Sequence, residues 1–172
     1  ALVSETNRDL TADERRAIAR VVGLGALKYA DLSNNRQSDY IFDWDKMLAF
    51  QGNTAPYLQY AYTRVRSIFR KMDAPNFATV EFRLKAPEEL ALAKHLMNFG
   101  QTLEMVAQDY RPNFLCNYLF ELAGHFSRFY EACPVLKAEE AERNSRLAIC
   151  ELTARVLRSG LDAMGIEVTE VM

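Results

Sequence analysis

The chain has 172 residues, of which 49% are hydrophobic and 26% are charged, and its formal net charge at pH 7 is −2. This composition is typical of one globular domain with a real core and a short extension. No apolar run approaches the roughly 18 residues needed to span a bilayer, which disfavours a membrane-spanning segment. With a negative net charge, nucleic-acid binding requires the basic residues to gather on one face, because phosphate contacts need local positive charge.

The first predicted element is a helix that begins after Thr11. Thr11 and Glu14 have the spacing of a capping box, in which each residue satisfies a backbone N–H at the start of a helix. Gly23 and Gly25 weaken this helix, so we expect a second helical piece over residues 26–32. The apolar side of the first piece consists of Ile18, Val21 and Val22.

A turn is expected at residues 33–35, where Ser-Asn-Asn follows the helix. Apolar and acidic residues then alternate over residues 38–45, which fits a short extended segment or a loop that leads into a short helix at 46–50. Trp44 is the only tryptophan. We expect its side chain to fill the seam between this arm and the rest of the fold.

A long helix is predicted to follow Asn53 or Thr54 and to run through Met72. Either residue can cap the helix, and Pro56 fits the first turn, where its missing N–H costs nothing. At about 100° per residue, one stripe of this helix faces the core. The stripe consists of Leu58, Ala61, Val65, Ile68, Phe69 and Met72.

A second stripe of the same helix lies roughly a quarter-turn from the core and consists of Tyr57, Tyr60, Arg64 and Lys71. Its tyrosine rings can offer flat faces to bases, and its cations can contact phosphates. From the spacing alone, the favoured interpretation is that the tyrosines are half-buried packing residues at the core edge with snorkelling cations beside them. The remaining polar positions that we expect to be solvated are Gln59, Arg66 and Arg70.

The rest of the chain is predicted to be helical apart from residues 73–86, which we expect to form a loop over the core. Apolar residues recur at helical spacing over 87–110, 113–132 and 138–164, and Gly165 suits the end of the last helix. Long helices with short connections pack as a bundle. The sequence therefore predicts an all-α helical bundle with a short amino-terminal helical arm.

Two parts of the chain also resemble a known family. The run GALKYADLSNNRQSDYIFDWDKMLAF followed by GNTAPYLQYAYTRVRSI is similar to the junction between the catalytic and anticodon-binding domains of bacterial arginyl-tRNA synthetases. The runs CNYLFELAGHFSRFYEACPVL and NSRLAICELTARVLRSGLDAMGIEVTEVM resemble that family's carboxyl end. The resemblance implies a piece of a class I synthetase, with residues 1–50 at the end of the catalytic domain and 51–172 in the anticodon-binding domain.

The resemblance further implies that this piece reads the anticodon loop of arginine tRNA, within a parent enzyme that arginylates the tRNA with ATP and magnesium. The tRNA-binding residues carried over by matched motifs are Tyr57, Tyr60, Arg64, Tyr130 and Met172. No His-x-Gly-His segment and no lysine-rich nucleotide loop occur, so we expect no catalytic residue and no cofactor site here. The alternative is a helical protein-interaction module that does not bind RNA.

Cysteines and histidines support neither a disulfide framework nor a metal site. Cys116, Cys133 and Cys150 leave one cysteine unpaired, and only His95 and His125 provide imidazoles. The cysteines suit a reducing compartment, so we expect a cytoplasmic protein, which we also expect to be a monomer. The amino end lacks a secretion signal and an initiator methionine, as expected of a piece of a longer chain.

Overall fold

The structure is a computed structural model that describes residues 10–70 and 80–172. Every regular element within these two ranges is a helix, which confirms the all-α prediction. The helices are α2 (Ala12–Leu32), α3 (Trp44–Met47), α4 (Ala55–Phe69), α5 (Pro87–Met97), α6 (Phe99–Asp109), α7 (Asn113–Ala132) and α8 (Glu140–Ala163).

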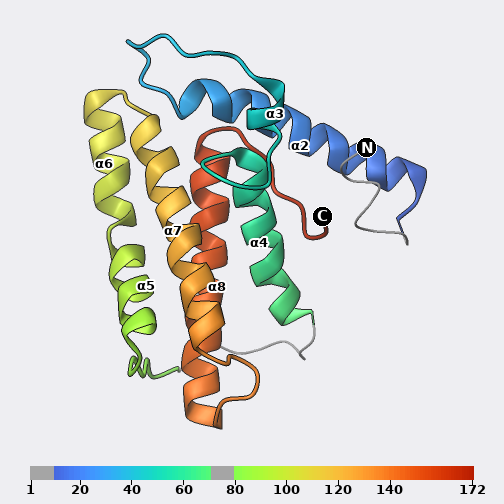
Figure 1. The fold of residues 1–172 in the computed structure, drawn as a ribbon. Coiled ribbons are helices and arrows are strands. Elements are labelled where there is room, and N and C mark those ends of the chain that lie inside the picture. Colours follow the sequence, from blue (N-terminus) through green and yellow to red (C-terminus); the bar gives the residue numbers. More distant parts are fainter. Residues whose placement is uncertain (1–9, 71–79) are drawn as a thin grey trace.

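The helices form a bundle with an arm across one end (Figure 1). Helices α4, α5, α7 and α8 lie side by side, and α6 continues from α5 along α7. Helix α7 is central, because it contacts α4, α5, α6 and α8 as well as α2. Helix α2 is the predicted arm, and it contacts α3, α4 and α7. The predicted bundle with a helical arm is therefore confirmed.

The core lies where the apolar stripes of α4, α7 and α8 meet. On α7 the predicted stripe is at most 2% exposed and consists of Leu115, Leu119, Leu122, Phe126 and Phe129. On α8 the buried stripe consists of Leu147, Cys150, Ala154, Leu157 and Leu161. Each fully buried leucine or phenylalanine contributes about 1.5–3 kcal/mol to folding, so these stripes are the main source of stability.

Helix α2 is one unbroken helix, so the prediction of two pieces was wrong. Thr11 caps it, and the predicted capping box with Glu14 is present. Gly25 does not interrupt the helix. Its missing side chain makes room for a neighbour, because a Cβ placed there would lie 2.8 Å from Gln59 Nε2. Gly25 therefore permits α2 to approach α4 closely.

The predicted helix over residues 87–110 is divided into α5 and α6 at Asn98. The backbone of Asn98 has ψ near −3°, well away from the α-helical value. Its carbonyl accepts hydrogen bonds from both the backbone N–H and the hydroxyl of Thr102. The bond from the Thr102 N–H is the ordinary backbone bond that begins α6, and the Asn98 side chain forms no capping hydrogen bond. The apolar periodicity did not reveal this change in the backbone.

Helix α4 ends at Phe69, before the predicted end at Met72. Lys71 and Met72 lie outside the described residues, as does the predicted loop from residue 73 to 79. Residues 80–86 have no regular structure, as expected of a loop. Ser145 holds this segment on α8, because its Oγ accepts a hydrogen bond from the Arg83 N–H at 2.8 Å.

The segment between α2 and α4 contains a turn after Leu32 and the four-residue helix α3. Asp43 caps α3 by accepting hydrogen bonds from the backbone N–H groups of Asp45 and Lys46. Trp44 is 56% exposed, so the prediction that it fills an internal seam was wrong. Its ring packs edge-on against Phe42, 4.8 Å away between centroids, on the surface.

The carboxyl tail, residues 166–172, follows one flank of α4 (Figure 1). Gln59 was predicted to be solvated but is 1% exposed, because its Nε2 donates to the Glu167 carbonyl at 2.8 Å. Arg66 was also predicted to be solvated, yet it is half-buried and bonded to Glu170. Arg70 is exposed as predicted, although it donates to the Glu170 carbonyl. The tail thus covers a face of α4 that helical periodicity alone left open.

Candidate nucleic-acid interface

The amino end of α4 is fixed by Thr54. Its hydroxyl accepts a hydrogen bond from the Tyr57 N–H at 3.3 Å and donates to the Ala49 carbonyl at 2.7 Å. Pro56 occupies the first turn, as predicted. The cap therefore sets the direction in which the first turn of α4 presents Tyr57 and Tyr60, and it also closes the loop that precedes the helix.

Helices α4 and α7 meet along a line of three side-chain pairs, which we call the α4–α7 seam. Asn53 Nδ2 donates to Asn117 Oδ1 at 3.0 Å. The Tyr57 ring lies 5.6 Å from the Phe120 ring between centroids. The Arg64 guanidinium carbon lies 5.0 Å from the centroid of the Tyr130 ring, close enough for a cation–π contact. Side chains more than 60 positions apart in sequence thus share one surface line.

Exposure differs among the three tyrosines predicted to bind RNA. Tyr60 is 46% exposed, and its ring has an edge contact with Phe50 at 6.4 Å. Tyr57 and Tyr130 are half-buried and pack against the core. Tyr57 of α4 and Tyr130 of α7 are therefore packing residues at the edge of the core, whereas Tyr60 presents much of its ring to solvent.

The cations of α4 differ in their partners. Arg66 forms ion pairs with Glu151 and Glu170, both at 3.1 Å. Within residues 10–70 and 80–172, no carboxylate lies within ion-pair distance of Arg64, whose guanidinium lies over the Tyr130 ring. A cation that is not already neutralised keeps its charge available for a phosphate. Arg64 is therefore the cation of α4 that best suits an RNA contact.

Glu170 belongs to the tail that occupies the opposite flank of α4. Its carboxylate accepts hydrogen bonds from the Tyr62 hydroxyl at 2.7 Å and from Arg66 Nε at 3.1 Å. Burial raises the pKa of Glu170, but these hydrogen bonds and the charge of Arg66 outweigh burial and leave the pKa below its ordinary value. The ionised carboxylate therefore holds the tail in place.

The structure brings together four of the five predicted tRNA-binding residues, but not Met172. Tyr57, Tyr60 and Arg64 come from α4, and Tyr130 comes from α7. Met172 ends the tail, and the tail contacts α4 through Glu167, Thr169 and Glu170 on the flank away from the α4–α7 seam. Figure 1 shows the same arrangement, with α7 and the carboxyl end on opposite sides of α4.

Three seam residues were not singled out from the sequence: Asn53 as a seam member, Asn117 and Phe120. On α7, Phe120 lies next to the apolar stripe, where an additional aromatic residue beside a core face was the available signal. The asparagine pair carried no signal, because nothing in the sequence relates positions 53 and 117.

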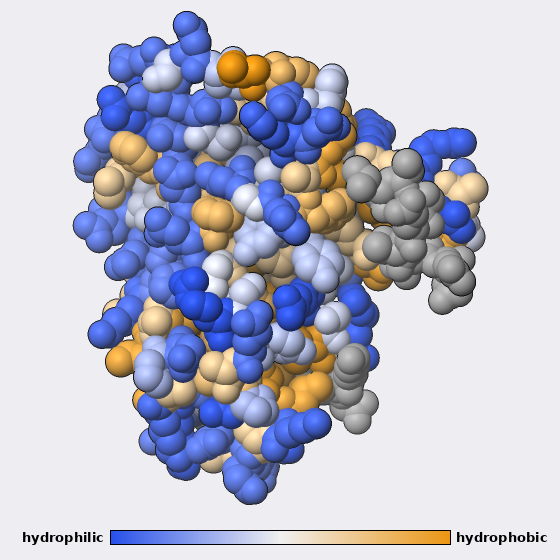
Figure 2. Space-filling model, in the orientation of Figure 1, coloured by the Kyte–Doolittle hydropathy of each residue, from blue (hydrophilic) through white to orange (hydrophobic). Residues whose placement is uncertain are grey.

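Figure 2 shows that apolar side chains gather more over α4 and α2 than over α6, which is largely hydrophilic.

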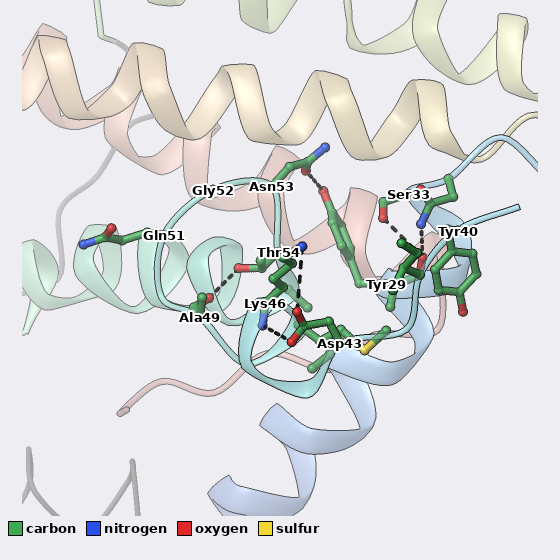
Figure 3. Close-up of a pocket in the computed structure, with 16 residues that line it drawn as sticks. Tyr29, Ser33, Tyr40, Asp43, Lys46, Ala49, Gln51, Gly52, Asn53 and Thr54 are labelled. Carbon is green, nitrogen blue, oxygen red and sulfur yellow. Dashed lines mark hydrogen bonds and ion pairs between the residues drawn. The ribbon is translucent and has the colours of Figure 1, made fainter. Parts of the chain in front are cut away.

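A cavity of about 480 Å³ lies beside the amino end of α4, between α2, α3 and the loop that precedes α4. Figure 3 shows Tyr29, Asp43, Lys46 and Thr54 around this space. Asn53 separates the cavity from the seam: its Oδ1 accepts a hydrogen bond from the Tyr29 hydroxyl at 2.5 Å, while its Nδ2 bonds to α7.

In the part of the chain that the structure describes, few other groups could bind a metal or act as a nucleophile. No group of three or more histidine, cysteine or acidic side chains is placed to hold a metal in residues 10–70 and 80–172. Cys116, Cys133 and Cys150 are buried and free. No helix in those residues is long and apolar enough to cross a bilayer.

Comparison with solved structures and curated proteins gives consistent results. The structure of Thermus thermophilus arginyl-tRNA synthetase is 33% identical with a TM-score of 0.92, covering 99% of this chain and 30% of that one. The arginyl-tRNA synthetase of Plasmodium falciparum is 31% identical with a TM-score of 0.83, covering 92% and 28%. An arginine–tRNA ligase of Shigella dysenteriae is 55% identical over 174 residues, covering 99% of this chain.

The chain spans about 30% of the length of the curated relatives it matches. Two family models match different parts of it. The model for the catalytic domain of class I tRNA synthetases (R) matches residues 1–44. The model for the DALR anticodon binding domain matches residues 58–172, which is most of the chain and includes α7, α8 and nearly all of α4. The chain therefore belongs to the DALR anticodon-binding domain family.

Proposed function

We propose that this chain recognises the anticodon loop of arginine tRNA as the anticodon-binding part of an arginine–tRNA ligase. Membership of the DALR family and the likeness to arginyl-tRNA synthetases support the proposal. The observation that carries it is the α4–α7 seam, where Arg64 lies over Tyr130 with Tyr57 and Tyr60 nearby on the same helix. Anticodon loops contain unstacked bases, which proteins bind with aromatic rings and guanidinium planes.

Within this proposal the tRNA-binding residues are Tyr57, Tyr60, Arg64, Tyr130 and Met172, in unequal roles. Tyr60 stacks on a base, because its ring is the most exposed of the three. Arg64 contacts a phosphate or a base plane from its place over Tyr130. Met172 contributes at the edge of the interface, since the tail holds it on the other flank of α4.

We place the boundary between the catalytic and anticodon-binding parts near residue 50, between the two family matches. The resemblance to class I synthetases implies that the parent enzyme uses ATP and magnesium. The described residues offer no cluster of metal-binding side chains that fits magnesium, so we assign no step of the reaction to them. We further propose a cytoplasmic monomer, and the three free cysteines support the compartment.

The test is filter binding of the chain to an arginine tRNA and to an unrelated tRNA over a range of salt concentrations. Tyr60→Ala is expected to weaken binding of the arginine tRNA by about tenfold, because stacking of one base on a ring is worth roughly 1–3 kcal/mol. Tyr110→Ala is the matched control: this tyrosine is 71% exposed but lies at the end of α6. It should leave the affinity unchanged.

Equal affinity for both tRNAs, together with no effect of Tyr60→Ala, would count against specific recognition. The competing function, a protein-interaction module, predicts no salt-dependent affinity for any RNA, because that dependence comes from counterions released by phosphate contacts. The same salt series therefore distinguishes the two functions.

A further inference from the structure

We propose that the cavity beside the amino end of α4 is a second nucleotide site, which receives one unpaired base of the RNA bound at the α4–α7 seam. The inference rests on the proposed function and extends it from the seam to a separate, concave site. The cavity is lined by α2, the segment after α2, α3 and the loop before α4.

The shape and lining of the cavity suit a nucleobase. Its volume of about 480 Å³ lies in the range of roughly 300–1,000 Å³ that is typical of small-molecule pockets. A base has apolar faces and polar edges, and the cavity offers both kinds of surface. The apolar part of the lining includes Ala26, Ala30, Met47, Ala49 and Ala55. The polar part includes Asn34, Asp43, Lys46, Asn53 and Thr54.

The charge of the cavity favours a base over a phosphate. Among its described lining residues, Asp43 and Lys46 are the charged ones, and Lys46 Nζ lies 3.7 Å from Asp43 Oδ2. Figure 3 shows this pair beside the space. The two charges cancel, so the lining has no net positive charge to attract a phosphate. A neutral heterocycle is the part of a nucleotide that such a lining accommodates without an electrostatic penalty.

Two lining groups can meet the edge of a base. Asn34 Nδ2 donates to the Ala30 carbonyl at 2.6 Å, and Asn34 Oδ1 remains an acceptor. The Lys46 side chain is 80% exposed, and its ammonium keeps three donors, because its ion pair with Asp43, at 3.7 Å, is longer than a hydrogen bond. An acceptor and a donor in one cavity match the mixed hydrogen-bonding edges of bases.

The position of the cavity relates it to the seam. Asn53 forms the wall between them, since it bonds to Tyr29 on one side and to Asn117 on the other. Asn53 lies two residues before α4, and Tyr57 lies in the first turn of that helix. When one base of the RNA stacks on the first turn of α4, the adjacent nucleotide of the RNA therefore lies close to the mouth of the cavity. The base of that nucleotide enters the cavity and fills it.

The experiment places 2-aminopurine, in turn, at each unpaired position of the anticodon loop and measures its fluorescence on binding to the chain. One position is expected to change its signal through insertion into the cavity. Ala30→Trp fills the cavity from α2 and should abolish that signal while weakening binding about tenfold. Ala19→Trp is the matched control, because Ala19 is exposed on α2 and does not line the cavity.

A second measurement needs no variant and locates the base directly. 4-Thiouridine at the reporting position is expected to crosslink, on irradiation, to a residue between 26 and 55. A crosslink outside this range, or Ala30→Trp binding like Ala19→Trp with all signals retained, would overturn the cavity assignment while leaving the seam intact. If the unaltered chain binds no arginine tRNA, the proposed function fails as well, so the two failures are distinguishable.

Discussion

Single side chains of the same type have different roles on α4, depending on their neighbours. Arg64 and Arg66 are two positions apart and carry the same charge, yet they face opposite flanks. Arg66 is neutralised by two carboxylates and fixes the tail. Arg64 lies over an aromatic ring, which attracts its charge without cancelling it. Arg64 is therefore one local positive charge on this surface, even though the net charge of the chain is −2.

His125 provides a prediction about pH at the same scale. It is half-buried, and its ring lies 4.8 Å from the His95 ring between centroids. Burial, together with the positive charges of His95 and Arg128, lowers the pKa of His125 below its ordinary value of 6.5. The folded chain therefore binds this proton less tightly than the unfolded chain. The stabilising effect of neutral His125 is complete above about pH 6.5 and is lost progressively as pH falls below that value.

We expect His125→Gln to flatten the dependence of the unfolding free energy on pH between about 7.5 and 5.5, where carboxylates contribute little. Urea unfolding at several pH values measures it. The same slope in the variant and in the unaltered chain would show that another group is responsible.

At the scale of elements, the approach of α2 to α4 depends on a position without a side chain. Gly23 and Gly25 lie in the same helix, two residues apart. A Cβ at Gly25 would meet Gln59 Nε2 at 2.8 Å and Ile166 Cγ2 at 3.2 Å, whereas a Cβ at Gly23 would have no heavy atom within 4 Å. These two positions are a natural matched pair, because the same substitution has opposite consequences.

Gly25→Ala is expected to destabilise the chain by about 1–3 kcal/mol, because the added methyl forces α2 away from α4 and the tail. Gly23→Ala should stabilise it by up to about 1 kcal/mol through helix propensity. Thermal unfolding followed by circular dichroism measures both. Stabilisation of similar size by the two substitutions would mean that the α2–α4 contact gives way without cost.

At the scale of the whole molecule, the tail joins segments that lie far apart in the sequence. Glu170 connects to Tyr62 and Arg66 across more than 100 residues. Glu167 lies on the same tail, but it bonds to Gln59 through its backbone carbonyl, and the residue is exposed. Substitutions at the two glutamates can therefore be compared to separate the loss of a carboxylate contact from the loss of a negative charge on the tail.

Glu170→Ala is expected to cost about 1–2 kcal/mol, because it breaks a partly exposed ion pair and leaves the hydroxyl of the buried Tyr62 without its partner. Glu167→Ala should change stability by less than about 0.5 kcal/mol, as is usual for surface positions. Chemical denaturation at pH 7 provides the comparison. If both variants lose the same stability, the tail is held by its backbone alone.

Local signals predicted the helices well, because caps and breakers act within a few residues. Thr11, Thr54 and Pro56 lie where the capping rules place them, and α7 begins and ends where its sequence indicates. The burial of Gln59 and the exposure of Trp44 were missed, because each depends on segments distant in sequence. For the same reason, motif and spacing singled out the tyrosines and Arg64 as candidates but gave no signal for the seam residues Phe120 and Asn117.

The tail also affects how the molecule is completed during synthesis. Residues 165–170 bind α2 and α4, which are made much earlier. Both helices leave the ribosome before residues 165–170, so the contacts of the tail with them form only after these residues have been made. A tag fused after Met172 begins two residues beyond Glu170, beside these late-forming contacts, and an amino-terminal tag is the better choice for binding experiments.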